Sequence, residues 1–92
     1  MKYFAVLLPL KDAEKSKKAR PEHLEFLKKM REEKKVLMNG RFTDGSGGLV
    51  IYVGENVKQV ESWVKEDPYI KIGARSYEIQ EWEMVTDANI QL

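Results

Sequence analysis

The sequence predicts an α+β sandwich with the ferredoxin-like order β-α-β-β-α-β, in a single domain that covers residues 1–92. Short apolar runs of strand length alternate with segments whose apolar residues recur at helical spacing. The whole pattern fits into 92 residues, which allows one modest core. Right-handed crossovers place both helices on one face of a four-stranded antiparallel sheet.

The strands are predicted from the apolar runs. Residues 3–10 are apolar at odd and even positions alike, which is typical of a central strand covered on both sides. A second strand is expected over residues 36–42, and the glycine-rich segment 43–48 forms a turn. Residues 49–53 form a third strand that is again apolar on both faces. The last strand is expected around residues 74–84.

The first helix is predicted to begin near Arg20. Pro21 fits the first helical position, and Glu22 suits the positive end of the helix dipole. The lysine-rich segment 11–18 is expected to be a solvated loop, or alternatively a mobile basic flap over an anionic ligand. The stripe expected to face the sheet consists of His23, Phe26, Leu27 and Met30.

The second helix is predicted from its capping residues. Asn56 is placed to cap it, with Gln59 at the position of a capping box. Asp67-Pro68 is expected to end the helix, because the residue before a proline is pushed out of the α region. Residues 85–92 form a short C-terminal tail that either docks on a neighbour or frays.

The composition restricts the possible functions. Lys and Arg number 16 against 15 Asp and Glu, so the basic excess of a nucleic-acid-binding protein is absent. There is no cysteine and one histidine, which predicts no metal site. The N-terminal apolar run is too short to span a bilayer, and Lys11 and Asp12 interrupt it, so we expect no membrane segment, no signal peptide and a cytoplasmic location.

The predicted topology gathers polar residues at one rim of the sheet. His23 begins the first helix, Asp44 lies in the turn between the second and third strands, and Asp67 follows the second helix. A carboxylate that accepts a hydrogen bond from one imidazole nitrogen makes the other nitrogen a usable general base. His23 with Asp67 or Asp44 would meet this need. The alternative is that His23 caps or packs and that Asp67 is only a turn residue.

The apolar character of both faces of the first and third strands predicts a dimer. Two helices cover one face of the sheet, and the other face would expose more apolar surface than monomers usually do. We therefore expect a homodimer whose two sheets stack face to face about a two-fold axis.

Several short motifs follow one another along nearly the whole chain. They are RPEHL at 20–24, GRFTDGSGG at 40–48, DPY at 67–69, then Gly73 and Trp82. In this order they resemble the YciI-like family. The resemblance covers residues 1–82.

The resemblance implies a dimeric ferredoxin-like fold with a pocket that holds a histidine–aspartate dyad. On the matching positions the dyad is His23 with Asp67, and Asp44 is the second candidate because the hairpin varies in the family. The usual glycine-proline of that hairpin is Gly40-Arg41 here, which adds a cation at the pocket. Some relatives are linked to dehydrohalogenase- or lyase-like chemistry on small cyclic compounds without a cofactor.

Three functions fit these observations. One is an enzyme in which His23 moves a proton on a small, anionic cyclic compound, as a lyase, dehydrohalogenase or isomerase would. The others are a dimeric metabolite-binding module and a purely structural partner protein. The residues expected to line the pocket are Arg20, His23, Arg41, Asp44, Asp67 and Tyr69.

Overall fold

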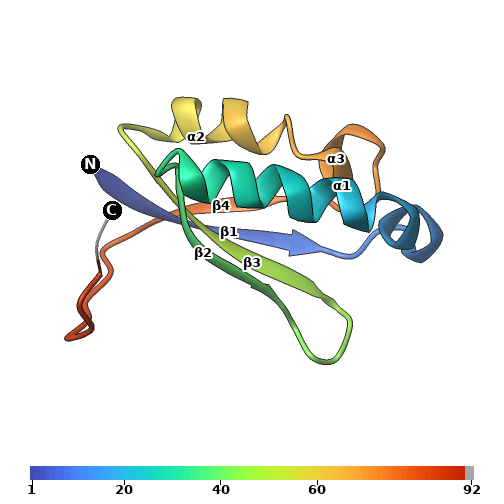
Figure 1. Cartoon of the computed structure of the whole chain (residues 1–92), viewed down its shortest axis with the longest axis horizontal. Helices are drawn as coiled ribbons and strands as arrows, with labels where there is room; N and C mark the ends of the chain where they lie inside the picture. Colours follow the sequence, from blue (N-terminus) through green and yellow to red (C-terminus); the bar gives the residue numbers. More distant parts are fainter. Residues whose placement is uncertain (91–92) are drawn as a thin grey trace.

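The computed structural model describes residues 1–90, and its sheet is antiparallel with the strand order β2-β3-β1-β4. Figure 1 shows the helices on one side of the sheet. This arrangement confirms the predicted ferredoxin-like α+β fold. The elements in chain order are β1 (Lys2–Pro9), α1 (Ala13–Glu32), β2 (Val36–Arg41), β3 (Gly47–Gly54), α2 (Val57–Val64), α3 (Pro68–Lys71) and β4 (Glu78–Trp82).

The core lies between the sheet and the helices. Phe4 pairs with Tyr52 and Val6 with Val50 across β1 and β3, and all four side chains are buried on the helix side. Leu27 of α1 is buried against the same cluster. Because side chains alternate along a strand, the intervening residues of β1 and β3 occupy the opposite face.

The prediction for the start of the first helix is wrong. Helix α1 begins at Ala13, where Asp12 caps it by accepting a hydrogen bond from Lys15 N at 3.1 Å. The lysine-rich segment is therefore helical, neither a loop nor a flap. Pro21 lies inside the helix and has no N–H, so the carbonyl of Lys17 has no partner within the helix. Both residues are exposed, so water can satisfy that carbonyl.

The end of the second helix also differs from the prediction. Helix α2 begins as expected, with Asn56 accepting from Gln59 N at 2.9 Å, but it already ends at Val64. Asp67 caps α3 instead, and Pro68 occupies the first position of that short helix. Strand β4 is shorter than expected, and residues 83–90 form no helix or strand. The expectation for the end of the tail falls on residues 91–92, outside the described residues.

The sheet face away from the helices is apolar along β1 and β3. Tyr3, Ala5 and Leu7 are half-buried there, whereas Met38 of β2 is 48% exposed. Trp82 pairs with Tyr3 and is 44% exposed. Within residues 1–90, no helix has the length and apolar character needed to cross a bilayer.

Candidate functional site

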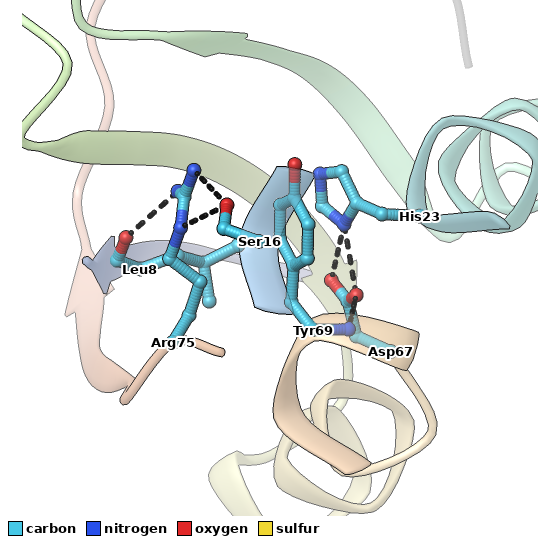
Figure 2. Close-up of polar contacts among 6 residues, drawn as sticks. All are labelled: Leu8, Ser16, His23, Asp67, Tyr69 and Arg75. Carbon is cyan, nitrogen blue, oxygen red and sulfur yellow. Dashed lines mark hydrogen bonds and ion pairs between the residues drawn. The ribbon is translucent and has the colours of Figure 1, made fainter. Parts of the chain in front are cut away.

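The centre of the candidate site is a hydrogen-bonded pair formed by His23 and Asp67 (Figure 2). The imidazole Nδ1 lies 2.8 Å from one carboxylate oxygen of Asp67 and 3.0 Å from the other. His23 is 7% exposed and Asp67 is fully buried. A buried carboxylate needs hydrogen-bond donors, and here they are the ring nitrogen and the backbone N–H of Tyr69, 2.9 Å from Asp67 Oδ1.

Local structure explains why these two residues meet. His23 lies on the buried face of α1, and Asp67 caps α3, which packs against α1. The cap fixes the carboxylate, because the same oxygen accepts from Tyr69 N and from His23 Nδ1. With Nδ1 donating to Asp67, the lone pair of the imidazole is on Nε2. Figure 2 shows this second nitrogen on the side away from Asp67.

One tyrosine stacks on the pair, and a second is affected by its charge. The ring of Tyr69 is stacked on the imidazole, with centroids 3.8 Å apart and an interplanar angle of 15°. Tyr52 is 1% exposed on β3. Burial, and secondly the charge of Asp67, raise the pKa of the Tyr52 phenol above its ordinary value of 10.0, so this phenol stays neutral.

An arginine completes the group of stacked side chains. The guanidinium of Arg75 lies over the ring of Tyr69, on the side away from His23, with Cζ 4.5 Å from the ring centroid (Figure 2). Its Nε and Nη2 donate to Ser16 Oγ at 3.2 and 3.0 Å, and Nη1 donates to the carbonyl of Leu8 at 3.2 Å. Imidazole, phenol and guanidinium thus form one column (Figure 2).

These groups border a cavity of about 130 Å³. Leu8, Leu24 and Leu27 form part of its apolar wall. A second, more open hollow continues from it towards the start of α1, and the two share Arg20, Arg41, Tyr69 and Arg75. Among residues 1–90, no acidic side chain lines either hollow. The site is therefore small, partly apolar and positively charged.

The structure brings most of the predicted residues together. His23, Arg20, Arg41 and Tyr69 line the cavity, and Asp67 lies directly behind His23. Asp44 is the exception. It is exposed in the β2–β3 turn, where its carboxylate accepts from Ser46 N at 2.9 Å. Hydrogen bonding from the side chain of Ser46, and secondly from its backbone, lowers the pKa of Asp44. The alternative pairing of Asp44 with His23 is therefore not observed.

Sequence reasoning missed Ser16, Tyr52 and Arg75. Ser16 precedes His23 by seven residues, so helical periodicity extended to the N-terminal side would have placed it on the same face. Tyr52 and Arg75 come from other elements, and no local pattern relates them to His23. Within residues 1–90 there is no cluster of His, Asp and Glu side chains that could hold a metal ion.

The fold and the site define a ferredoxin-like α+β protein with a His–Asp pair on a cationic cavity. The chain belongs to the family of the YCII-related domain, whose family model matches residues 1–83. This finding confirms the resemblance to YciI-like proteins.

Two similar proteins extend the comparison. The uncharacterized protein YjpA of Bacillus subtilis (strain 168) is 29% identical over 62 residues, which make up 67% of this chain and 73% of YjpA. The structure of 5-chloro-2-hydroxyhydroquinone dehydrochlorinase (TftG) from Burkholderia phenoliruptrix AC1100, in complex with 2,5-dihydroxybenzoquinone, superposes with a TM-score of 0.76. The match covers 88% of this chain and 93% of TftG at 19% identity, so it establishes a shared fold.

Proposed function

We propose that this protein is a cofactor-independent enzyme of the lyase type, in which His23 is the general base and Asp67 orients it. The substrate is a small, anionic cyclic compound. The observation that carries the proposal is the pairing of a buried carboxylate with the Nδ1 of a histidine that also borders a cavity. An imidazole held in this way has a fixed tautomer and an available Nε2.

The chemistry follows from the arrangement of the side chains. A hydroxyl proton first moves to the ring carbon that carries the leaving group, which makes that carbon tetrahedral. Nε2 of His23 then takes a proton from a conjugated hydroxyl group, and the released electron pair forms a double bond as a leaving group such as chloride departs. Asp67 stabilises the imidazolium that results. Arg20 and Arg41 border the cavity and offset negative charge on the substrate. Loss of the proton and of chloride together amounts to elimination of HCl.

The structural neighbour supports this choice of reaction. TftG, which has the same fold, is a dehydrochlorinase, and its structure holds 2,5-dihydroxybenzoquinone. A ring of that size matches a small cavity with one apolar wall. The absence of acidic residues from the cavity lining favours a ligand that carries negative charge.

We further propose that the protein works as a homodimer through the sheet face opposite the helices. That face combines the half-buried residues of β1 with the exposed Met38 and Trp82. Stacking two such faces would remove this apolar surface from water.

The direct test is release of chloride from 5-chloro-2-hydroxyhydroquinone under anaerobic conditions. The protein should accelerate the release above the rate without protein, and His23→Gln should lower that acceleration about a hundredfold or more, the usual contribution of a positioned base. Asp44→Asn is the matched control and should keep full activity, because Asp44 is exposed in the turn.

Two outcomes would reject the proposal. Equal rates for the unaltered protein and His23→Gln would mean that His23 is not the base. Binding of 2,5-dihydroxybenzoquinone without any accelerated release of chloride would favour a metabolite-binding module instead. Calorimetry measures the binding of that quinone, and the chloride assay shows whether release is accelerated.

A further inference from the structure

Arg75 is fixed in place by contacts that leave part of its guanidinium unused. A guanidinium has five N–H groups. Ser16 Oγ accepts a hydrogen bond from Nε and another from Nη2, and the Leu8 carbonyl accepts one from Nη1. One N–H on each terminal nitrogen remains, on a side chain that borders both hollows.

Within the described part of the chain, no acidic side chain forms an ion pair with Arg75. Among residues 1–90, the ion pairs are Lys2–Glu81, His23–Asp67, Lys35–Glu33 and Lys71–Glu66, and none involves Arg75. Its hydrogen-bond acceptors are a neutral hydroxyl and a neutral carbonyl. A partly buried cation with neutral partners gains most from an anion that arrives with the ligand.

The backbone before Arg75 sets its position accurately. Gly73 has φ 75° and ends α3, with Gly73 N donating to Ile70 O at 3.1 Å and Ala74 N to Tyr69 O at 2.9 Å. These two bonds form a Schellman motif. Arg75 N also donates to Tyr69 O, at 3.2 Å. The guanidinium is thereby held one aromatic ring away from His23.

We propose that Arg75, positioned by Ser16, is the carboxylate-binding residue of the site, and that the ligand is a small aromatic or cyclic carboxylic acid. The carboxylate accepts hydrogen bonds from the two remaining N–H groups of Arg75. The ring of the ligand lies against the apolar wall of the cavity, and its edge faces His23. The location of the ring beside His23 rests on the proposed function, whereas the carboxylate site on Arg75 does not.

Geometry favours a carboxylate over a phosphate group. A carboxylate is planar and presents two oxygens, which match two N–H groups of a planar guanidinium. The cavity beside His23 is about 130 Å³, which suits one ring with a small substituent. A phosphate ester would add a bulky tetrahedral group to the same space.

The test compares benzoate with benzamide, which has the same shape and no charge. Calorimetry should show that benzoate binds more tightly than benzamide. Arg75→Gln should weaken benzoate binding by at least about tenfold, the usual effect of losing a charge-assisted pair of hydrogen bonds, and should leave benzamide unchanged. Arg75→Lys should restore part of the affinity, because a lysine keeps the charge without the fork.

Lys17→Met is the matched control for charge alone. Lys17 borders the outer hollow and is exposed, so its loss should change benzoate affinity less than about twofold. Equal losses in Lys17→Met and Arg75→Gln would overturn the proposal in favour of a diffuse positive field. Tighter binding of phenyl phosphate than of benzoate would overturn the choice of carboxylate.

Two further measurements keep the result independent of folding and of catalysis. In the unaltered protein, the Nε–H resonance of Arg75 should shift when benzoate is added, and a resonance that does not move would count against the proposal even if Arg75→Gln fails to fold. The same benzoate titration in His23→Gln should still depend on Arg75. Benzoate binding that depends on Arg75, without chloride release, would support this inference and reject the enzymatic function. Chloride release without Arg75-dependent benzoate binding would support the enzymatic function and reject this inference.

Discussion

Asp67 accepts hydrogen bonds from His23 Nδ1 at 2.8 Å and from the backbone N–H of Tyr69 at 2.9 Å, both through Oδ1. One carboxylate therefore pairs with the imidazole and caps helix α3 at the same time. The backbone bond fixes the carboxylate independently of the histidine. The orientation of the imidazole thus depends on a helix cap.

Asp67→Asn should change the tautomer of the His23 imidazole while preserving the cap of helix α3. The asparagine amide oxygen still accepts from Tyr69 N, but the amide nitrogen can donate to Nδ1 and so favours the tautomer with its proton on Nε2. A protonated Nε2 cannot take a proton from the substrate. We expect chloride release to fall about a hundredfold or more, with little change in the denaturation midpoint.

The ¹⁵N shifts of the imidazole nitrogens report this tautomer directly. The chain contains one histidine, so no other ring overlaps with it. Asp44→Asn should leave both shifts unchanged. If Asp67→Asn kept the original tautomer and the original activity, the pairing would have no catalytic role.

Tyr52 should make the protein less stable in alkali. Its pKa is raised above 10.0 by burial and by Asp67, so the folded state holds the phenol proton after the unfolded chain has released it. The stabilisation by the neutral phenol is complete below pH 10.0 and is lost as the pH rises through the higher pKa of the folded state. Urea denaturation above and below pH 10.0 measures this loss.

Tyr52→Phe should lose less folding stability above pH 10.0 than the unaltered protein, because the phenylalanine cannot ionise in the unfolded chain. Tyr3→Phe is the control, since Tyr3 is half-buried on the opposite face of the sheet. The same pH dependence in both variants would contradict a dominant role of Tyr52.

The sequence was sufficient for the fold class and for the region of the site. Apolar runs and right-handed crossovers bring His23, Asp44 and Asp67 to one rim, the resemblance to YciI-like proteins favours Asp67 as the partner, and in the structure His23 contacts Asp67. The reasoning succeeded although the local assignments were partly wrong. His23 lies within α1, well after its first turn, and Asp67 caps α3 where the end of α2 was expected.

The errors have a physical cause. Pro21 favours a helix start, but here it lies inside a helix at a position where both Pro21 and Lys17, the residue whose carbonyl it leaves unpaired, are exposed to water. Arg75 escaped notice because its role depends on the left-handed turn at Gly73, which joins it to Tyr69. That relationship is tertiary, and no periodicity in the sequence encodes it.

Gly73→Ala should destabilise the protein by about 1–2 kcal/mol, the cost of the left-handed conformation for a residue with a Cβ. Apart from Gly73 and its two chain neighbours, no described residue has an atom within 4 Å of the position of that Cβ, so the cost comes from φ 75° alone. Gly40→Ala is the control, because its Cβ position is equally open and its φ is not positive. Urea denaturation should separate the two variants, and equal stability would contradict strain at Gly73.

The proposed dimer predicts that a charge on the open sheet face separates the subunits. Met38 is 48% exposed on β2, so Met38→Glu should be tolerated within one subunit and unfavourable between two stacked sheets. Val57, 50% exposed on α2, gives a control of similar exposure on the helix side. Sedimentation equilibrium at micromolar concentration should yield a dimer for the unaltered protein and for Val57→Glu, and a monomer for Met38→Glu. A monomer in all three cases would reject the dimer, and a dimer in all three would move its interface away from this face.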